Sequence, residues 1–130
     1  MASQIDGSSW ANPELIFGMT TVEHLDHRDL ALLDDSVRRD YTGVSTTDLL
    51  RLVDANQVQF WKLIDGARRA VVITRINQLN SGRELFIWHM AGNKGTLTEH
   101  GRAVLERLEY FARSMECDWI HTQSEPRMAR

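Results

Sequence analysis

The segment that decides the fold reads Glu84-Leu85-Phe86-Ile87-Trp88-His89-Met90-Ala91-Gly92-Asn93-Lys94-Gly95-Thr96. Its apolar and aromatic half predicts a strand over Glu84–Met90, and its glycines predict a turn. An amphipathic helix over Leu97–Met115 should follow, because apolar residues recur there at the 3.6-residue period of a helix. A further strand is expected over Cys117–Thr122, so the helix would connect two parallel strands in a right-handed crossover.

Two more strands are predicted ahead of this segment. Val58–Ile64 and Ala70–Ile76 are rich in β-branched and other apolar residues, and the dipeptide Asp65-Gly66 between them favours a tight turn. Asn80-Ser81-Gly82 supplies a second turn before Glu84–Met90. Three consecutive strands with short connections predict an antiparallel meander.

The first half of the chain is expected to be helical. Residues 24–40 carry one apolar stripe, with Asp26 as N-cap, and Thr46 or Thr47 should cap a second short helix. The sequence therefore predicts an α+β fold. Its elements are two N-terminal helices, a three-stranded antiparallel meander, a long amphipathic helix and a final parallel strand.

Residues 1–20 differ in composition from the rest and are expected to form an N-terminal arm before a single domain over residues 21–130. The arm is rich in Ser, Gly, Asn and Thr. Two interpretations stay open for it: a partly ordered tail, or an arm that docks on a neighbouring subunit. In the second, the apolar side chains of Trp10, Leu15, Ile16 and Phe17 would be the anchors.

Composition and charge exclude several classes of protein. The chain has 130 residues, 25% of them charged, and a net charge of -3, so no nucleic-acid footprint is expected. No apolar run reaches the ~18–20 residues of a membrane span. The single cysteine, Cys117, permits no internal disulfide, which indicates synthesis in a reducing cytoplasm. His24 and His27 lack the further ligands that a metal site needs, so no metal is predicted.

The start of the long helix is a candidate anion site. Backbone N–H groups of Lys94, Gly95 and Thr96 could hold a phosphate group there, since helix N-termini favour anions. Ordinary capping is the alternative, and Thr96 followed by Glu99 fits a capping box.

The order of predicted elements resembles the GNAT superfamily of N-acetyltransferases. That resemblance implies an acyl-CoA cofactor, with its pyrophosphate at Lys94, Gly95 and Thr96, and with His89 or His121 as general base. The glycines within Ala91–Gly101 do not have the spacing of the family's cofactor motif, however, so the motif is degenerate here. The alternative is that Trp88 and His89 simply alternate between the core and the outer face.

A narrower resemblance covers Leu105–Ile120, which is similar to short GNAT-like proteins encoded in tailed-phage genomes. Only eight residues follow Thr122, too few for the elements that close the acceptor side in the family, so the fold is expected to be truncated. Trp119 and the C-terminal Arg127 and Arg130 would then form a contact edge for a partner.

Together these features predict a non-catalytic structural or interaction protein that needs no cofactor. It would be made in the cytoplasm of a host bacterium and assembled into a tailed-phage virion, with other virion proteins or further copies of itself as partners. Two alternatives stay open: an acyl-CoA-dependent N-acyltransferase completed by dimerisation, which would use acetyl-CoA, and a small factor that binds one host protein.

Overall fold

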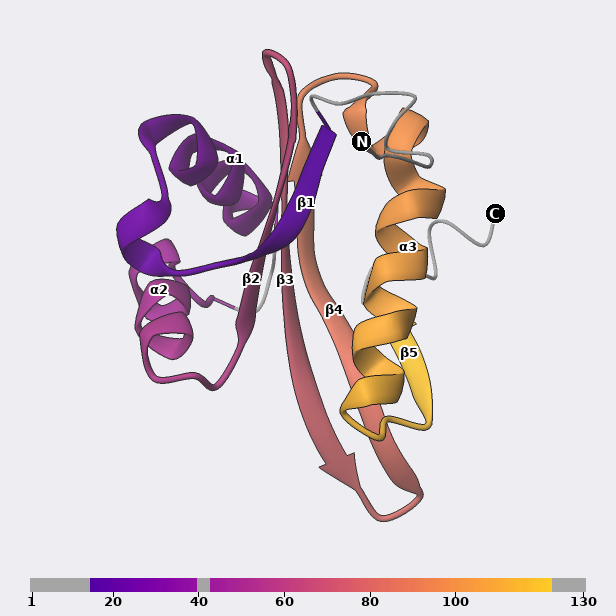
Figure 1. Ribbon diagram of the computed structural model, residues 1–130. Coiled ribbons are helices and arrows are strands. Elements are labelled where there is room, and N and C mark those ends of the chain that lie inside the picture. Colours follow the sequence, from indigo (N-terminus) through magenta and orange to yellow (C-terminus); the bar gives the residue numbers. More distant parts are fainter. Residues whose placement is uncertain (1–14, 40–42, 123–130) are drawn as a thin grey trace.

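The computed structural model describes residues 15–39 and 43–122, which form one α+β domain (Figure 1). The predicted fold class is confirmed. In chain order the elements are β1 (Leu15–Thr20), the short 3₁₀ helix η2 (Val22–His24), α1 (His27–Arg38), α2 (Thr46–Asp54), β2 (Gln59–Asp65), β3 (Arg68–Leu79), β4 (Gly82–Gly92), α3 (Thr96–Ser114) and β5 (Trp119–Thr122).

The five strands form one sheet in the order β1-β2-β3-β4-β5. Neighbours from β1 to β4 pair antiparallel, and β4 pairs parallel with β5, as the crossover through α3 requires. Helices α1 and α2 lie on one side of the sheet and α3 lies on the other (Figure 1). The meander, the long helix and the final strand stand where the sequence predicted them, within about three residues at each end.

Strand β1 was not among the predicted elements. Leu15–Thr20 pairs with β2 from Leu15 opposite Asp65 to Thr20 opposite Phe60. Phe17 stacks on Trp61 with ring centroids 5.4 Å apart. Residues 15–20 therefore belong to the sheet of the domain and not to an arm ahead of it. The remainder of the expected arm, including Trp10, lies outside the described residues.

The sheet has a hydrophobic cluster on each face. On the α3 side the buried residues are Trp61, Leu63, Ala70, Val72, Leu85, Ile87, Val104, Leu108 and Ala112. On the α1 and α2 side they are Leu33, Leu49, Val53, Val58, Phe60, Val71, Ile73 and Ala91. Because side chains alternate across a strand, successive residues of β3 serve the two clusters in turn.

Each helix begins at a residue whose chemistry explains the start. Asp26 caps α1 as predicted, in a capping box with Asp29. Ser45, not Thr46 or Thr47, caps α2. At α3 the expected capping box is absent, because Gly95 is the N-cap with φ at +83°, a conformation that favours glycine.

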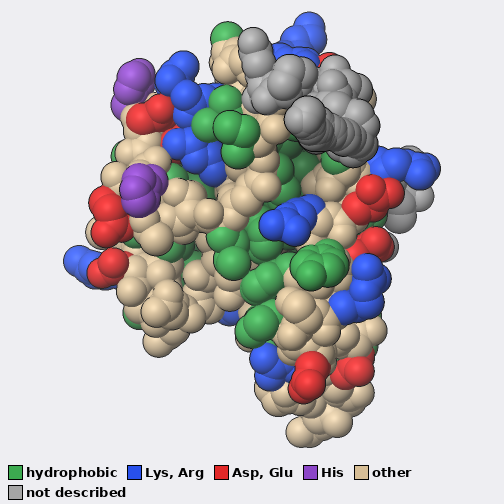
Figure 2. Space-filling model, viewed as in Figure 1, with side chains coloured by type: hydrophobic (Ala, Val, Ile, Leu, Met, Phe, Trp, Pro, Cys, Tyr) green, Lys and Arg blue, Asp and Glu red, His purple; other side chains and the backbone are tan. Residues whose placement is uncertain are grey.

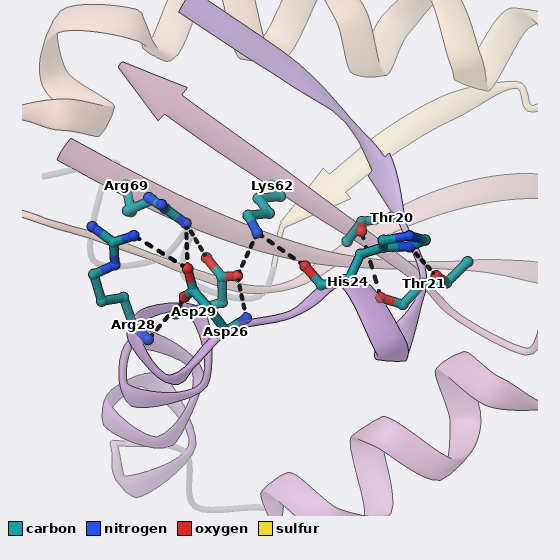
Figure 3. A network of polar contacts seen from close by, with 8 residues as sticks. All are labelled: Thr20, Thr21, His24, Asp26, Arg28, Asp29, Lys62 and Arg69. Carbon is teal, nitrogen blue, oxygen red and sulfur yellow. Dashed lines mark hydrogen bonds and ion pairs between the residues drawn. The ribbon is translucent and has the colours of Figure 1, made fainter. Parts of the chain in front are cut away.

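A buried ion network fastens α1 to the sheet (Figure 3). Asp29 is fully buried, with its carboxylate 2.7 Å from Lys62 Nζ and 3.3 Å from an Arg69 guanidinium nitrogen. Arg69 also reaches Asp26 at 3.0 Å. A buried carboxylate is tolerated only when such partners compensate for lost hydration, so this network fixes α1 on β2 and β3.

Strand β4 contains a bulge at Trp88. Ile73 of β3 lies opposite His89, yet the next residue, Thr74, lies opposite Ile87, so Trp88 has no partner of its own in the ladder. A bulge of this kind places two neighbouring side chains against one residue of the partner strand. Trp88 and His89 stack with ring centroids 5.5 Å apart. The bulge thus adds one aromatic side chain to this part of the sheet.

Candidate functional site

The β3–β4 hairpin extends well beyond α2 at one end of the molecule (Figure 1). On this end β4 also pairs with β5, where Glu84 lies opposite Trp119 and Phe86 lies opposite His121. Strand alternation and register place one set of side chains on the sheet face that carries α1 and α2 farther along. This set, the sheet-face patch, comprises Arg75, Asn77, Glu84, Phe86, Trp119 and His121, and Trp88 of the bulge belongs to it through its contact with Arg75.

A buried carboxylate lies at the centre of the sheet-face patch. Glu84 is only 7% exposed, and it accepts hydrogen bonds from Asn77 Nδ2 at 2.8 Å and from Trp119 Nε1 at 3.0 Å. His121 Nδ1 stands 3.7 Å from the same Oε1 atom that Trp119 binds. Glu84 thereby holds β5 against β4 and fixes the orientation of the indole of Trp119, a residue that is 37% exposed.

Arg75 is held in the patch by aromatic rings. Its Cζ atom stands 4.4 Å from the Trp88 ring centroid and 5.9 Å from that of Phe86. Within residues 15–39 and 43–122 no carboxylate lies within ion-pair distance of it, and its Nε atom is buried without a hydrogen bond. Arg75 therefore presents a cation that is fixed by stacking and not neutralised by the described part of the chain.

The two histidines proposed as general bases have different surroundings. His89 is 4% exposed, and its Nδ1 atom shares a 3.0 Å hydrogen bond with Ser36 Oγ of α1. His121 is half-exposed in the sheet-face patch, near Glu84 and against the Phe86 ring. His89 thus links α1 to β4, whereas His121 is open to a ligand.

The start of α3, predicted as an anion site, is closed by the chain's own groups. Thr96 is fully buried, and its backbone N–H donates to the Asn93 carbonyl. Asn93 in turn exchanges hydrogen bonds with the Arg69 backbone. Lys94 and Gly95 remain exposed. Only part of the predicted binding loop is therefore accessible.

Two carboxylates also flank this helix start. Arg68 binds Glu99 at 2.7 Å and Asp65 at 2.5 Å, and the carboxylates of Glu99 and Asp65 raise the pKa of Arg68. His100 Nε2 lies 2.8 Å from Asp65. One possible ligand atom from each of Asp65, Glu99 and His100 lies within 4.8 Å of the other two. The Arg68 guanidinium, however, is bound to both carboxylates. This charge pattern disfavours a further cation and offsets the attraction of the helix start for an anion.

The apolar residues proposed for partner contact are divided between the core and the surface. Leu15 and Phe17 pack on the chain's own core, whereas Ile16 is 60% exposed. Apolar side chains also gather between β1 and α3 on the face seen in Figure 2. On its other side α3 borders an open groove of about 500 Å³ that includes Leu105, Cys117 and Trp119. Arg127 and Arg130 lie outside the described residues.

Comparison with known proteins finds a similarity in fold alone. No protein-family model matches the sequence, and no curated protein sequence matches it. The chain superimposes on the solved tetramutant of the BH1408 protein from Bacillus halodurans with a TM-score of 0.59. The match covers 83% of this chain and 81% of that one at 12% identity. Among the described helices, none combines the length and apolar character needed to cross a membrane.

Proposed function

We propose that this chain is a non-catalytic interaction domain with a GNAT-like fold, and that it is a component of a tailed-phage virion. The observation that carries the interaction role is the sheet-face patch, where Trp119 and His121 are exposed beside a buried carboxylate. Aromatic side chains with one polar tip are typical of protein interfaces. The assignment to a virion rests on the resemblance of Leu105–Ile120 to short phage-encoded proteins.

The surroundings of α3 support a role without acyl-CoA. A pyrophosphate at this helix start would meet the carboxylates of Asp65 and Glu99 at close range. Thr96, one of the three residues expected to bind it, is fully buried. Like charges in contact oppose binding, so the predicted cofactor site is a poor match for a polyanion.

The proposal is tested by finding the partner. Purified virions should contain the chain in stoichiometric amounts by mass spectrometry, and the free protein should form an oligomer or a defined complex in light scattering. Trp119→Ala should weaken that assembly at least tenfold, because a central aromatic anchor typically contributes 2 kcal/mol or more, by an order-of-magnitude estimate. Tyr110→Ala, which also removes a large aromatic side chain but at an exposed position of α3, serves as control. A monomeric protein absent from virions would contradict the proposal.

The second candidate is an acyl-CoA-dependent N-acyltransferase, and the pairing of His121 with Glu84 favours it. A histidine whose nitrogen lies 3.7 Å from a buried carboxylate has the composition of an acid–base pair. Such an enzyme should bind acetyl-CoA with a Kd of about 1 μM in calorimetry, equivalent to about -8 kcal/mol. His121→Ala should then abolish acyl transfer and spare cofactor binding. If no heat is detected up to about 1 mM acetyl-CoA, this candidate is excluded.

A further inference from the structure

We propose that Arg75 binds a carboxylate of an acidic protein segment that lies across the sheet-face patch. This inference rests on the proposed interaction role and adds the chemistry of the partner. It begins from the contrast between Arg75 and three other basic side chains of β2 and β3. Lys62, Arg68 and Arg69 each have at least one carboxylate of this chain within 3 Å. Arg75 has none among the described residues.

The setting of Arg75 favours a planar anion. The Cζ atom of Arg75 lies over the Trp88 ring, and an arginine that stacks on an aromatic face in this way keeps the N–H groups at the edge of its guanidinium free to donate hydrogen bonds. A carboxylate matches two of those donors at once, and charge-assisted bonds of this kind are the strong ones. Because stacking already restricts the side chain, binding would cost less conformational entropy than at a free surface arginine.

The rest of the patch restricts the partner to a protein segment. Glu84 places a carboxylate in the same patch, and the whole chain carries a net charge of -3, so a polyanion such as RNA would be repelled. A ligand with a single carboxylate could pair with Arg75 and would be repelled by Glu84 much less than a polyanion would. Phe86 and Trp119 would contact apolar side chains beside the acidic residue, because their rings lie on the same face. The expected ligand is an extended segment with an Asp or Glu between apolar residues.

The test compares two blocked peptides that differ in one group. Acetyl-Ala-Phe-Glu-Leu-Ala-amide and its Gln counterpart are titrated against the full chain, with tryptophan fluorescence as readout. The Glu peptide should bind about tenfold more tightly, because it alone offers a carboxylate to Arg75. Arg75→Met should remove this difference, and Arg75→Lys should restore part of it, since an ammonium attracts the charge without the bidentate geometry.

Arg83→Met is the matched control. Arg83 lies on the same hairpin with its Nε also buried and unbonded, but strand alternation places it on the opposite sheet face. Its replacement should leave the preference for the Glu peptide unchanged. Near-UV circular dichroism checks that each variant keeps the native fold.

Three results of the peptide titrations would overturn the inference: equal binding of the two peptides, a preference that survives Arg75→Met, or no binding of the Glu peptide up to about 5 mM. An Arg75-dependent complex with single-stranded RNA that is tighter than the peptide complex would also overturn it. Trp119→Ala separates this inference from the interaction role. If Trp119→Ala disrupts assembly while the two peptides bind alike, the interaction surface stands and the carboxylate assignment falls.

Discussion

Arg69 and Arg75 lie on the same face of β3, six residues apart, and the fold treats them in opposite ways. Arg69 is 8% exposed beneath α1, where it binds the carboxylates of Asp26 and Asp29. Arg75 lies toward the far end of the hairpin, where aromatic rings are its neighbours and no described carboxylate reaches it. The two arginines thus mark a covered end and an open end of one sheet face.

This contrast separates the residues that stabilise the fold from the residues that remain available to bind a partner. At the covered end each buried charge has an internal partner, as expected where water is excluded. At the open end, the rings of Phe86 and Trp88 contact the Arg75 cation, and no carboxylate of the described residues neutralises it. Substitutions at the covered end should therefore affect stability, and substitutions at the open end should affect binding.

Asp29→Ala would break the covered end and should have the largest effect. It leaves Lys62 without its carboxylate in the interior and removes one of the two carboxylates that Arg69 binds, at a cost of about 3–5 kcal/mol. Urea denaturation followed by circular dichroism measures the loss. Asp35→Ala is the control and should cost less than about 1 kcal/mol, because the ion pairs of Asp35 with described residues are to two exposed arginines. Equal losses in both variants would show that the network does not hold α1.

The same substitution at the two arginines tests the comparison directly. Arg69→Met should lower the free energy of unfolding by about 2 kcal/mol, since it removes charged hydrogen bonds from a buried carboxylate. Arg75→Met should cost about 1 kcal/mol or less, the usual value of a cation–π contact. Urea midpoints of the two variants give the ranking. A larger loss for Arg75 would mean that the open end is a structural element.

Ser36→Ala sharpens the account of His89. The hydrogen bond between Ser36 Oγ and His89 Nδ1 joins α1 to β4 in the interior, so its loss should cost about 1 kcal/mol. The expected result is a lower urea midpoint with no change in acetyl-CoA or peptide titrations. Altered peptide binding would instead connect His89 to the open end.

Acid should weaken the covered end gradually, and this is the smallest expected effect. The backbone N–H of Asp29 holds the pKa of the Asp26 carboxyl well below its ordinary range, and Arg69 adds to that shift. Because the folded pKa is below the unfolded value of about 3.9, the stabilisation is present above that pH and is lost as pH falls toward the folded pKa. Urea midpoints measured from pH 6 to pH 2.5 should therefore fall less steeply in Asp26→Asn than in the parent chain.

The sequence predicted elements with a clear period and missed contacts that depend on register. The stripe through Val104, Leu108 and Ala112 identifies α3, and these residues are indeed buried. Strand β1 was not predicted, because Leu15, Ile16 and Phe17 form a continuous apolar run that lacks the alternation of a half-buried strand.

The sheet-face patch could not be read from the chain for a similar reason. Glu84 and Trp119 are 35 residues apart, and only the pairing of β4 with β5 brings them together. The one signal of the patch in the sequence was Glu84, a charged residue within the predicted strand Glu84–Met90. Simple alternation would place Trp88 and His89 on opposite faces of the sheet, but this is wrong, because the bulge leaves both side chains on the face that carries α1 and α2.

The bulge has an evolutionary consequence. Ile87 faces the α3 cluster and Ala91 faces the other one, and both keep the sides they would have in a ladder that lacked Trp88. Trp88 is therefore an extra residue whose removal would leave the flanking residues of β4 in place. A lineage could gain or lose the platform beneath Arg75 by adding or removing one codon, without redesigning the interior.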